Sequence, residues 1–86
     1  MATLSYTLTL EWAAANRYTA AAEQDVLLSN SGTYPMYFAI TADDTPPTVA
    51  SVRAHPLPIY ASRAMQLQAG ERLWLAGYAG HAALAT

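Results

Sequence analysis

The sequence contains no cysteine and no lysine, and it has only two histidines, His55 and His81. Without cysteine the chain can form neither disulfides nor thiolate metal sites, and nothing points to an oxidising compartment. Two histidines without His-x-His or His-Glu-x-x-His spacing are too few for the usual zinc sites. We therefore expect no metal and no cofactor.

Charge is also scarce, at 12% of the residues against about 25% in typical domains, while 53% are hydrophobic. All four cations are arginines, a weakly hydrated residue that suits protein interfaces better than open surface. The net charge of −2 gives no basic footprint for nucleic acid. This composition favours packing against other protein copies and predicts no nucleic-acid partner.

Targeting and membrane signals are missing as well. The beginning of the chain has no positively charged segment followed by an apolar one, as a signal peptide would. The longest mostly apolar run, from Leu73 to Ala85, is too short to span a bilayer. We expect a single domain over residues 1–86 that is made in the cytoplasm and has no membrane partner.

The sequence contains none of the catalytic motifs considered next. No serine lies in Gly-x-Ser-x-Gly, and Gly77 and Gly80 do not form a phosphate-binding loop. Asp43 and Asp44 lack the twelve-residue calcium-loop pattern around them. No pair among the six acidic residues is placed across a cleft by spacing alone. The sequence predicts a protein that is not an enzyme.

The strongest positive signal is alternation. Large apolar residues occupy every second position from Leu4 to Trp12, with Thr, Ser or Glu between them. A strict period of two is typical of a strand with one buried face, so we predict a strand over 3–12. Tyr6 and Trp12 would then belong to the core with three leucines.

The next segment is ambiguous. Ala13 to Asn16 is too short to nucleate a helix and is interpreted as a turn or bulge, which leads into a strand from Arg17 to Ala22. The alternative is a short helix from Ala13 to Gln24, which the alanines favour and the lack of a large apolar stripe opposes.

The middle of the chain suggests a hairpin and a loop. Asp25–Ser29 is predicted to be a short strand, and an Asn-Ser-Gly turn signal separates it from Tyr34–Thr41. We predict that Val26–Ser29 and Tyr34–Thr41 pair as a hairpin. Ala42–Thr48, with two acids and Pro46-Pro47, is predicted to be an irregular loop. Val49–Val52 is predicted to be a short edge strand.

Four further segments complete the predicted fold. The prolines within Arg53–Tyr60 predict an edge position, and Ala64–Gln68 alternates like a strand. Arg72–Tyr78 and His81–Thr86 are predicted to form a closing hairpin around Ala79-Gly80. With six to eight short strands, the fold class is all-β, a compact antiparallel β-sandwich or small barrel.

Six residues are candidate partner contacts. Trp74 and Tyr78 share a face opposite Leu73 and Leu75, so they form an exposed aromatic patch if the leucines are core. The Pro-Pro pair could act as a stiff prong, and two arginines could donate directional hydrogen bonds. The candidate contacts are Trp74, Tyr78, Pro46, Pro47, Arg53 and Arg63.

The order of features from Val26 to Thr86 resembles small β-sandwich structural proteins of tailed-phage particles and phage-like gene transfer particles. The similar parts are Leu27–Gly32 followed by a strand, a proline-rich middle, Leu67-Gln-Ala-Gly-Glu-Arg-Leu-Trp-Leu75, and a last strand with glycines. The resemblance implies a compact sandwich that decorates a capsid or joins fibres and tail parts. It implies a virion location and transfers no catalytic residue.

Two functions from different classes follow. The first is a non-enzymatic structural subunit of a phage or phage-like particle, a capsid decoration, fibre or adaptor component. It would pack against its own copies, as a trimer or higher oligomer, and against a capsid, tail or fibre protein. The alternative is a carbohydrate-binding, lectin-like module, in which exposed aromatics stack on sugars and Asn30, Gln66 or Gln68 hold hydroxyl groups.

Overall fold

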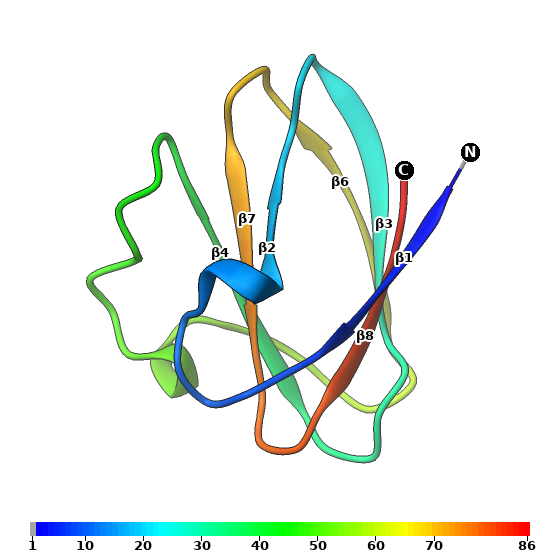
Figure 1. Cartoon of the computed structure of the whole chain (residues 1–86). Coiled ribbons are helices and arrows are strands. Elements are labelled where there is room, and N and C mark those ends of the chain that lie inside the picture. The colour runs from blue at the N-terminus through cyan, green and yellow to red at the C-terminus, as the bar shows by residue number, and fades with distance from the viewer. Residues whose placement is uncertain (1) are drawn as a thin grey trace.

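The computed structural model describes residues 2–86 and shows two four-stranded antiparallel sheets packed face to face (Figure 1). Sheet I contains, in spatial order, β1 (Thr3–Thr7), β8 (His81–Ala85), β3 (Gln24–Asn30) and β6 (Ser62–Leu67). Sheet II contains β2 (Arg17–Thr19), β7 (Arg72–Ala76), β4 (Met36–Thr41) and β5 (His55–Leu57). Two short 3₁₀ turns, η1 (Ala14–Asn16) and η2 (Ser51–Arg53), interrupt the connections. The predicted all-β class is confirmed, and the architecture is a small β-sandwich.

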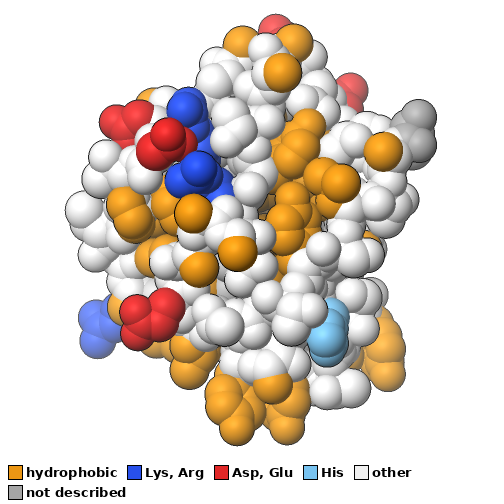
Figure 2. Space-filling view, in the orientation of Figure 1, with side chains coloured by type: hydrophobic (Ala, Val, Ile, Leu, Met, Phe, Trp, Pro, Cys, Tyr) orange, Lys and Arg blue, Asp and Glu red, His pale blue; other side chains and the backbone are white. Residues whose placement is uncertain are grey.

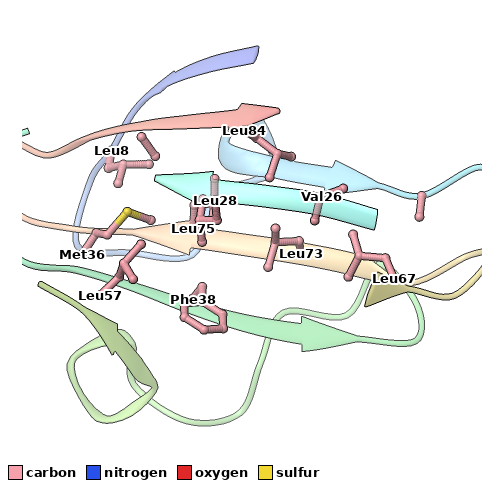
Figure 3. Close-up of a cluster of buried hydrophobic side chains, with 12 residues drawn as sticks. Leu8, Val26, Leu28, Met36, Phe38, Leu57, Leu67, Leu73, Leu75 and Leu84 are labelled. Carbon is pink, nitrogen blue, oxygen red and sulfur yellow. The ribbon is translucent and has the colours of Figure 1, made fainter. Parts of the chain in front are cut away.

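The core lies between the two sheets and consists mainly of leucines (Figure 3). In sheet I, Leu28 is opposite Leu84, and in sheet II, Phe38 is opposite Leu75. Because side chains alternate across a strand, each such row places its apolar members on the inner face. In β7, Leu73 and Leu75 are fully buried, so the structure decides what the sequence left open: the leucine face of this strand belongs to the core.

Both predicted hairpins are wrong. β7 pairs with β2 and β4, whereas β8 pairs with β1 and β3, so the closing strands lie in different sheets. The same holds for β3 and β4. Each short connection crosses from one sheet to the other, which lets both strands bury an apolar face against the same core. A turn signal between two strands does not distinguish this crossing from a hairpin.

The first strand is shorter than predicted, because it ends at Thr7 instead of Trp12. The Leu8 amide still donates to the Gly80 carbonyl, but the Thr9 carbonyl accepts from the Gly77 amide, so the chain passes across the end of the sandwich. Leu8 is buried, whereas Leu4 and Leu10 are exposed. Tyr6 and Trp12 are both half-buried. Tyr6 packs against the core cluster, whereas Trp12 is not part of it, so the core prediction holds at the margin for Tyr6 and is wrong for Trp12.

The remaining connections correct three more details. Residues 13–24 form η1 and β2 rather than the alternative helix, and β2 ends at Thr19 instead of Ala22. Residues 42–48 form an irregular loop as predicted. Val49–Val52 is not an edge strand, because it leads into the 3₁₀ turn η2. The predicted edge position of the proline-containing segment is confirmed by β5, which pairs only with β4.

Candidate functional site

Three loops at one end of the sandwich carry exposed tyrosines. They are residues 31–35 between β3 and β4, 58–61 between β5 and β6, and 77–80 between β7 and β8, all at the lower end in Figure 1. Tyr34 is 45% exposed, Tyr60 87% and Tyr78 62%. Among residues 2–86 these are the exposed aromatic side chains. We call residues 31–35, 58–61 and 77–80 together the tyrosine end.

Asn30 holds two of these loops in place from inside. Its Nδ2 donates to the carbonyl oxygens of Tyr34, at 2.8 Å, and Leu57, at 3.0 Å. Its Oδ1 accepts from the Gly32 amide at 3.0 Å. The side chain is 3% exposed, so these bonds replace the hydration that a buried amide would otherwise lose. The tyrosine end is therefore built on a rigid polar support.

The third loop is joined to the first by close packing. The Tyr34 and Tyr78 rings meet edge to face, with centroids 5.4 Å apart. A Cβ on Gly32 would lie 2.8 Å from the backbone nitrogen of His81, so only glycine permits this approach. The Ser31 amide also donates to the His81 carbonyl. Tyr34 and Tyr78 thus form one aromatic pair rather than two isolated side chains.

Two non-glycine residues in these loops have a left-handed backbone conformation, which only glycine adopts without strain. Tyr60 has φ of 64° and Ala79 has φ of 47°. They are the non-glycine residues with positive φ among residues 2–86, and both lie in the tyrosine end. Such a conformation costs about 1–2 kcal/mol for an L-residue and concentrates at functional sites. At Tyr60 this strain is present although the side chain is almost entirely in solvent.

The tyrosine end carries no Asp, Glu, Lys or Arg. Figure 2 shows hydrophobic side chains gathered at the lower tip of the molecule, while the largest group of charges in view lies at the upper left. Tyrosine combines large apolar contact area with a hydroxyl and few rotatable bonds, which makes it the commonest anchor in binding loops. The surface is suited to packing against another apolar and weakly polar surface.

Trp74, a predicted contact, is not exposed. It lies on the outer face of sheet II, but it is only 2% exposed and forms no patch with Tyr78. Its indole Nε1 donates to Thr41 Oγ1 at 2.8 Å, and the Arg17 guanidinium lies 5.1 Å from its ring centroid. The prediction of an exposed Trp74 is wrong because neighbouring segments cover this outer face. Tyr78 is exposed, but it follows β7 instead of lying on it.

Pro46 and Pro47 lie in the loop that follows β4, on the side of sheet II away from the core. The loop and β4 border an open, shallow depression of about 490 Å³. Asp44 fastens the loop through Arg72, at 2.9 Å, and Arg17, at 3.5 Å. Pro46 is exposed and Pro47 is half-buried. This loop begins where β4 ends, whereas the tyrosine end adjoins the start of β4, so the two are separate surfaces.

The two predicted arginine contacts also lie apart from each other. Arg53 is exposed at the end of η2. Arg63 points inward from β6, with its guanidinium 5.5 Å from the Phe38 ring centroid. It lines a cavity of about 230 Å³ with Phe38, His55 and other side chains at one open side of the sandwich. Arg63 therefore covers the margin of the core.

The fold shifts the pKa of Tyr6 and of Asp43. Burial, with a smaller contribution from nearby Tyr18, raises the pKa of the Tyr6 hydroxyl. The pKa of Asp43 is lowered by hydrogen bonds from Thr45. Within residues 2–86, no three His, Asp or Glu side chains gather as a potential metal cluster. No helix in that range is long and apolar enough to cross a membrane.

Sequence reasoning missed Tyr34 and Tyr60. The sequence pattern places Tyr34 in a strand and Tyr60 in an extended edge segment. A signal was present, because Tyr34 follows Ser-Gly-Thr and precedes proline, and Tyr60 follows Pro-Leu-Pro-Ile. Residues in such turn-forming surroundings belong to surface loops, where binding residues concentrate.

Comparisons of the chain with protein-family models, with curated proteins and with solved structures found no match. The resemblance to particle proteins therefore stays a hypothesis based on the order of sequence features.

Proposed function

We propose that this chain is a non-enzymatic structural subunit that attaches to other proteins through the tyrosine end. The observation that carries the proposal is Tyr60, whose aromatic side chain is 87% exposed on a left-handed backbone. Packing within the chain gives no reason to keep a tyrosine there, and glycine would relieve the strain. A side chain kept at a cost to the fold is explained by a contact outside it.

The chemistry of the tyrosine end favours a protein surface over a sugar. A lectin site needs side-chain amides or charges beside the aromatic rings to hold hydroxyl groups. The Asn30 amide is buried and committed to Tyr34, Leu57 and Gly32. Gln66 bonds to Glu23 near the far end of β6, and Gln68 lies beyond that strand. The polar partners proposed for the lectin function do not surround the tyrosines.

The more specific proposal, a role in a phage or phage-like particle, rests on the sequence resemblance. As capsid decoration, fibre or adaptor component, each copy would contribute one small aromatic contact. Repetition on a symmetric lattice then gives strong attachment, because the second and later contacts form at high effective concentration. A small domain with a single contact end is suited to such repeated use.

The test is incorporation into particles made by the organism that encodes the chain. Density-gradient fractions are analysed by quantitative mass spectrometry for wild type, Tyr60→Ala and Tyr78→Ala. Leu27→Ala is the matched control, because Leu27 is 42% exposed on the outer face of sheet I, away from the loops. We expect wild type and the control to sediment with particles in constant ratio. The tyrosine variants should remain at the top of the gradient.

Two outcomes would contradict the proposal. One is that the chain never sediments with a particle, and the other is that both tyrosine variants incorporate like wild type. A glycan array probed with the purified chain tests the alternative function. If the chain binds a specific glycan and Tyr60→Ala abolishes that binding, the function is sugar recognition rather than protein packing.

A further inference from the structure

We propose that β1 is a self-complementary edge that joins two copies of this chain, so that sheet I continues across a two-fold axis at Ser5. This inference is independent of the tyrosine end. It concerns the free edge of sheet I, where β1 pairs with β8 on one side and with no other strand among the described residues.

The direction of the backbone groups in β1 follows from its two flanking hydrogen bonds. The Thr86 amide donates to the Ala2 carbonyl, and the Leu8 amide donates to the Gly80 carbonyl. In an antiparallel ladder, residues that bond to one neighbour alternate with residues that point away from it. Even-numbered residues thus bond toward β8. Thr3, Ser5 and Thr7 direct their N–H and C=O groups outward.

The outward set is symmetric about Ser5. In an antiparallel pair of two β1 strands, Ser5 would be opposite Ser5 of the second copy, and Thr3 would be opposite Thr7. Each of these pairs would exchange both of its N–H···O bonds. Thr–Thr and Ser–Ser neighbours across strands are favourable pairs. The strand is therefore compatible with its own reversed copy at every outward position.

The inner face of β1 is also self-complementary. In the same register Leu4 of one copy would be opposite Tyr6 of the other, which is a favourable aromatic–aliphatic pair. Leu4 is 38% exposed and Tyr6 is half-buried. Figure 2 shows hydrophobic side chains in the hollow between β2 and β1, at this open side of the sandwich. Sheet I of a second copy, joined at β1, would cover the exposed side of Leu4 and Tyr6.

The other three edge strands carry features that oppose strand addition. β5 has three residues and contains Pro56, which lacks an amide donor. β2 has three residues, and Arg17 within it is engaged with Asp44 and Trp74. β6 is longer, but Arg63 points inward from it, a charge that a neighbouring strand would have to bury. β1 has neither proline nor charge.

The symmetry has a geometric consequence. The two β1 strands run in opposite directions. The tyrosine end adjoins the C-terminal end of β1, so the two copies place their tyrosine ends on opposite sides of the joined sheet. The tyrosine ends would therefore face away from each other. Such a dimer would be bivalent.

The first experiment measures native mass by light scattering over a concentration series, with Ser5→Pro as the test variant. Proline at Ser5 removes an outward N–H and keeps the bonds to β8, so β1 remains in its sheet. Ala64→Pro is the matched control, because the Asn30 amide donates to the Ala61 carbonyl and the alternation makes Ala64 an outward residue of β6.

We expect wild type and Ala64→Pro to have about twice the 9.2 kDa mass of one chain at high concentration. Ser5→Pro should keep the mass of one chain, with its dimer dissociation constant raised by at least 100-fold. A wild-type monomer over the whole series would overturn the proposal. A dimer that Ser5→Pro leaves intact, or that Ala64→Pro dissociates, would overturn it as well.

A second experiment needs no proline and also tests the register. The chain has no cysteine, so a single introduced cysteine forms disulfides only between copies. Opposed residues of a hydrogen-bonded pair have Cα atoms about 5.5 Å apart, within disulfide reach. Ser5→Cys should give a cross-linked dimer under a mild oxidant. Thr3→Cys, which would be opposite Thr7, and Ala64→Cys should not.

Equal cross-linking of the three cysteine variants would refute the two-fold pairing at Ser5. The results also separate this proposal from the tyrosine end. Tyr78→Ala should leave the dimer mass unchanged. Ser5→Pro should weaken particle attachment, because each monomer then attaches through one tyrosine end instead of two. Loss of dimerisation in Tyr78→Ala would mean that the copies meet through the loops instead of β1.

Discussion

Trp74 provides the sharpest test of the packing described for sheet II. It is 2% exposed although it lies on the face of β7 away from the core. Removing a buried indole ring usually costs about 3–5 kcal/mol, because the transfer free energy is lost and a cavity remains. The total stability of an 86-residue domain is roughly 4–13 kcal/mol. Trp74→Ala should therefore remove a large fraction of the free energy of unfolding.

The indole hydrogen bond can be tested separately. Trp74 Nε1 donates to Thr41 Oγ1, and valine at position 41 keeps the shape while removing the acceptor. An unpaired buried donor costs about 1–3 kcal/mol, so Thr41→Val should lose about that amount. Trp74→Phe keeps most of the apolar ring and should fall between wild type and Trp74→Ala.

Urea unfolding at equilibrium is a suitable assay, because Trp12 remains as a fluorescent probe when Trp74 is replaced. For a domain of this size, a loss of 1 kcal/mol lowers Tm by about 4–8 °C, so thermal unfolding gives an independent value. A Trp74→Ala variant that loses less than about 1 kcal/mol would refute the covered position of the indole. It would return Trp74 to the exposed interface expected from sequence.

Asn30→Ala should lower the free energy of unfolding by about 2–4 kcal/mol, because the carbonyls of Tyr34 and Leu57 lose their donor. Urea unfolding measures the loss, and unchanged hydrogen exchange in residues 31–35 and 58–61 would contradict the support role. Tyr60→Gly should keep or raise stability, by up to about 1 kcal/mol, since its φ is positive; a clear drop in Tm would mean that the tyrosine packs within the fold. Hydrogen bonds from Thr45 lower the pKa of Asp43, so the carboxylate stabilises its turn above the ordinary aspartate pKa, and this stabilisation is lost as pH falls through the lower folded-state value. An NMR titration of Asp43 should show that lower midpoint, and a midpoint at or above the ordinary range would refute the assigned hydrogen bonds.

Local patterns predicted most of the strands, including the one that becomes β7. The alternation around Leu73 and Leu75 predicted a strand but left open which of its faces is core; both leucines are fully buried, and Trp74 on the opposite face is buried as well. The Pro-Pro segment was predicted to be irregular, and it forms a loop. These features depend on the period of the side chains and on proline geometry, which act over a few residues.

Pairing partners and the surface depended on contacts far apart in the chain. A turn signal states that the chain reverses, but only the position of the shared core decides whether the next strand joins the same sheet or the opposite one. Trp74 is buried because Arg17 and Thr41 meet it from other strands. Tyr34 and Tyr60 form part of one end because Asn30 bonds to Tyr34 in one loop, and to Leu57 and Ala61 on either side of Tyr60.

The sequence by itself thus determined an all-β chain with few charges, leucine-rich strands and loops marked by glycine and proline, since each of these is a local or compositional property. The tertiary structure alone decided which aromatic residues are exposed, because burial of a strand's outer face depends on what the rest of the chain lays over it. That is why Trp74 belongs to the fold, and why Tyr34, Tyr60 and Tyr78 remain in solvent.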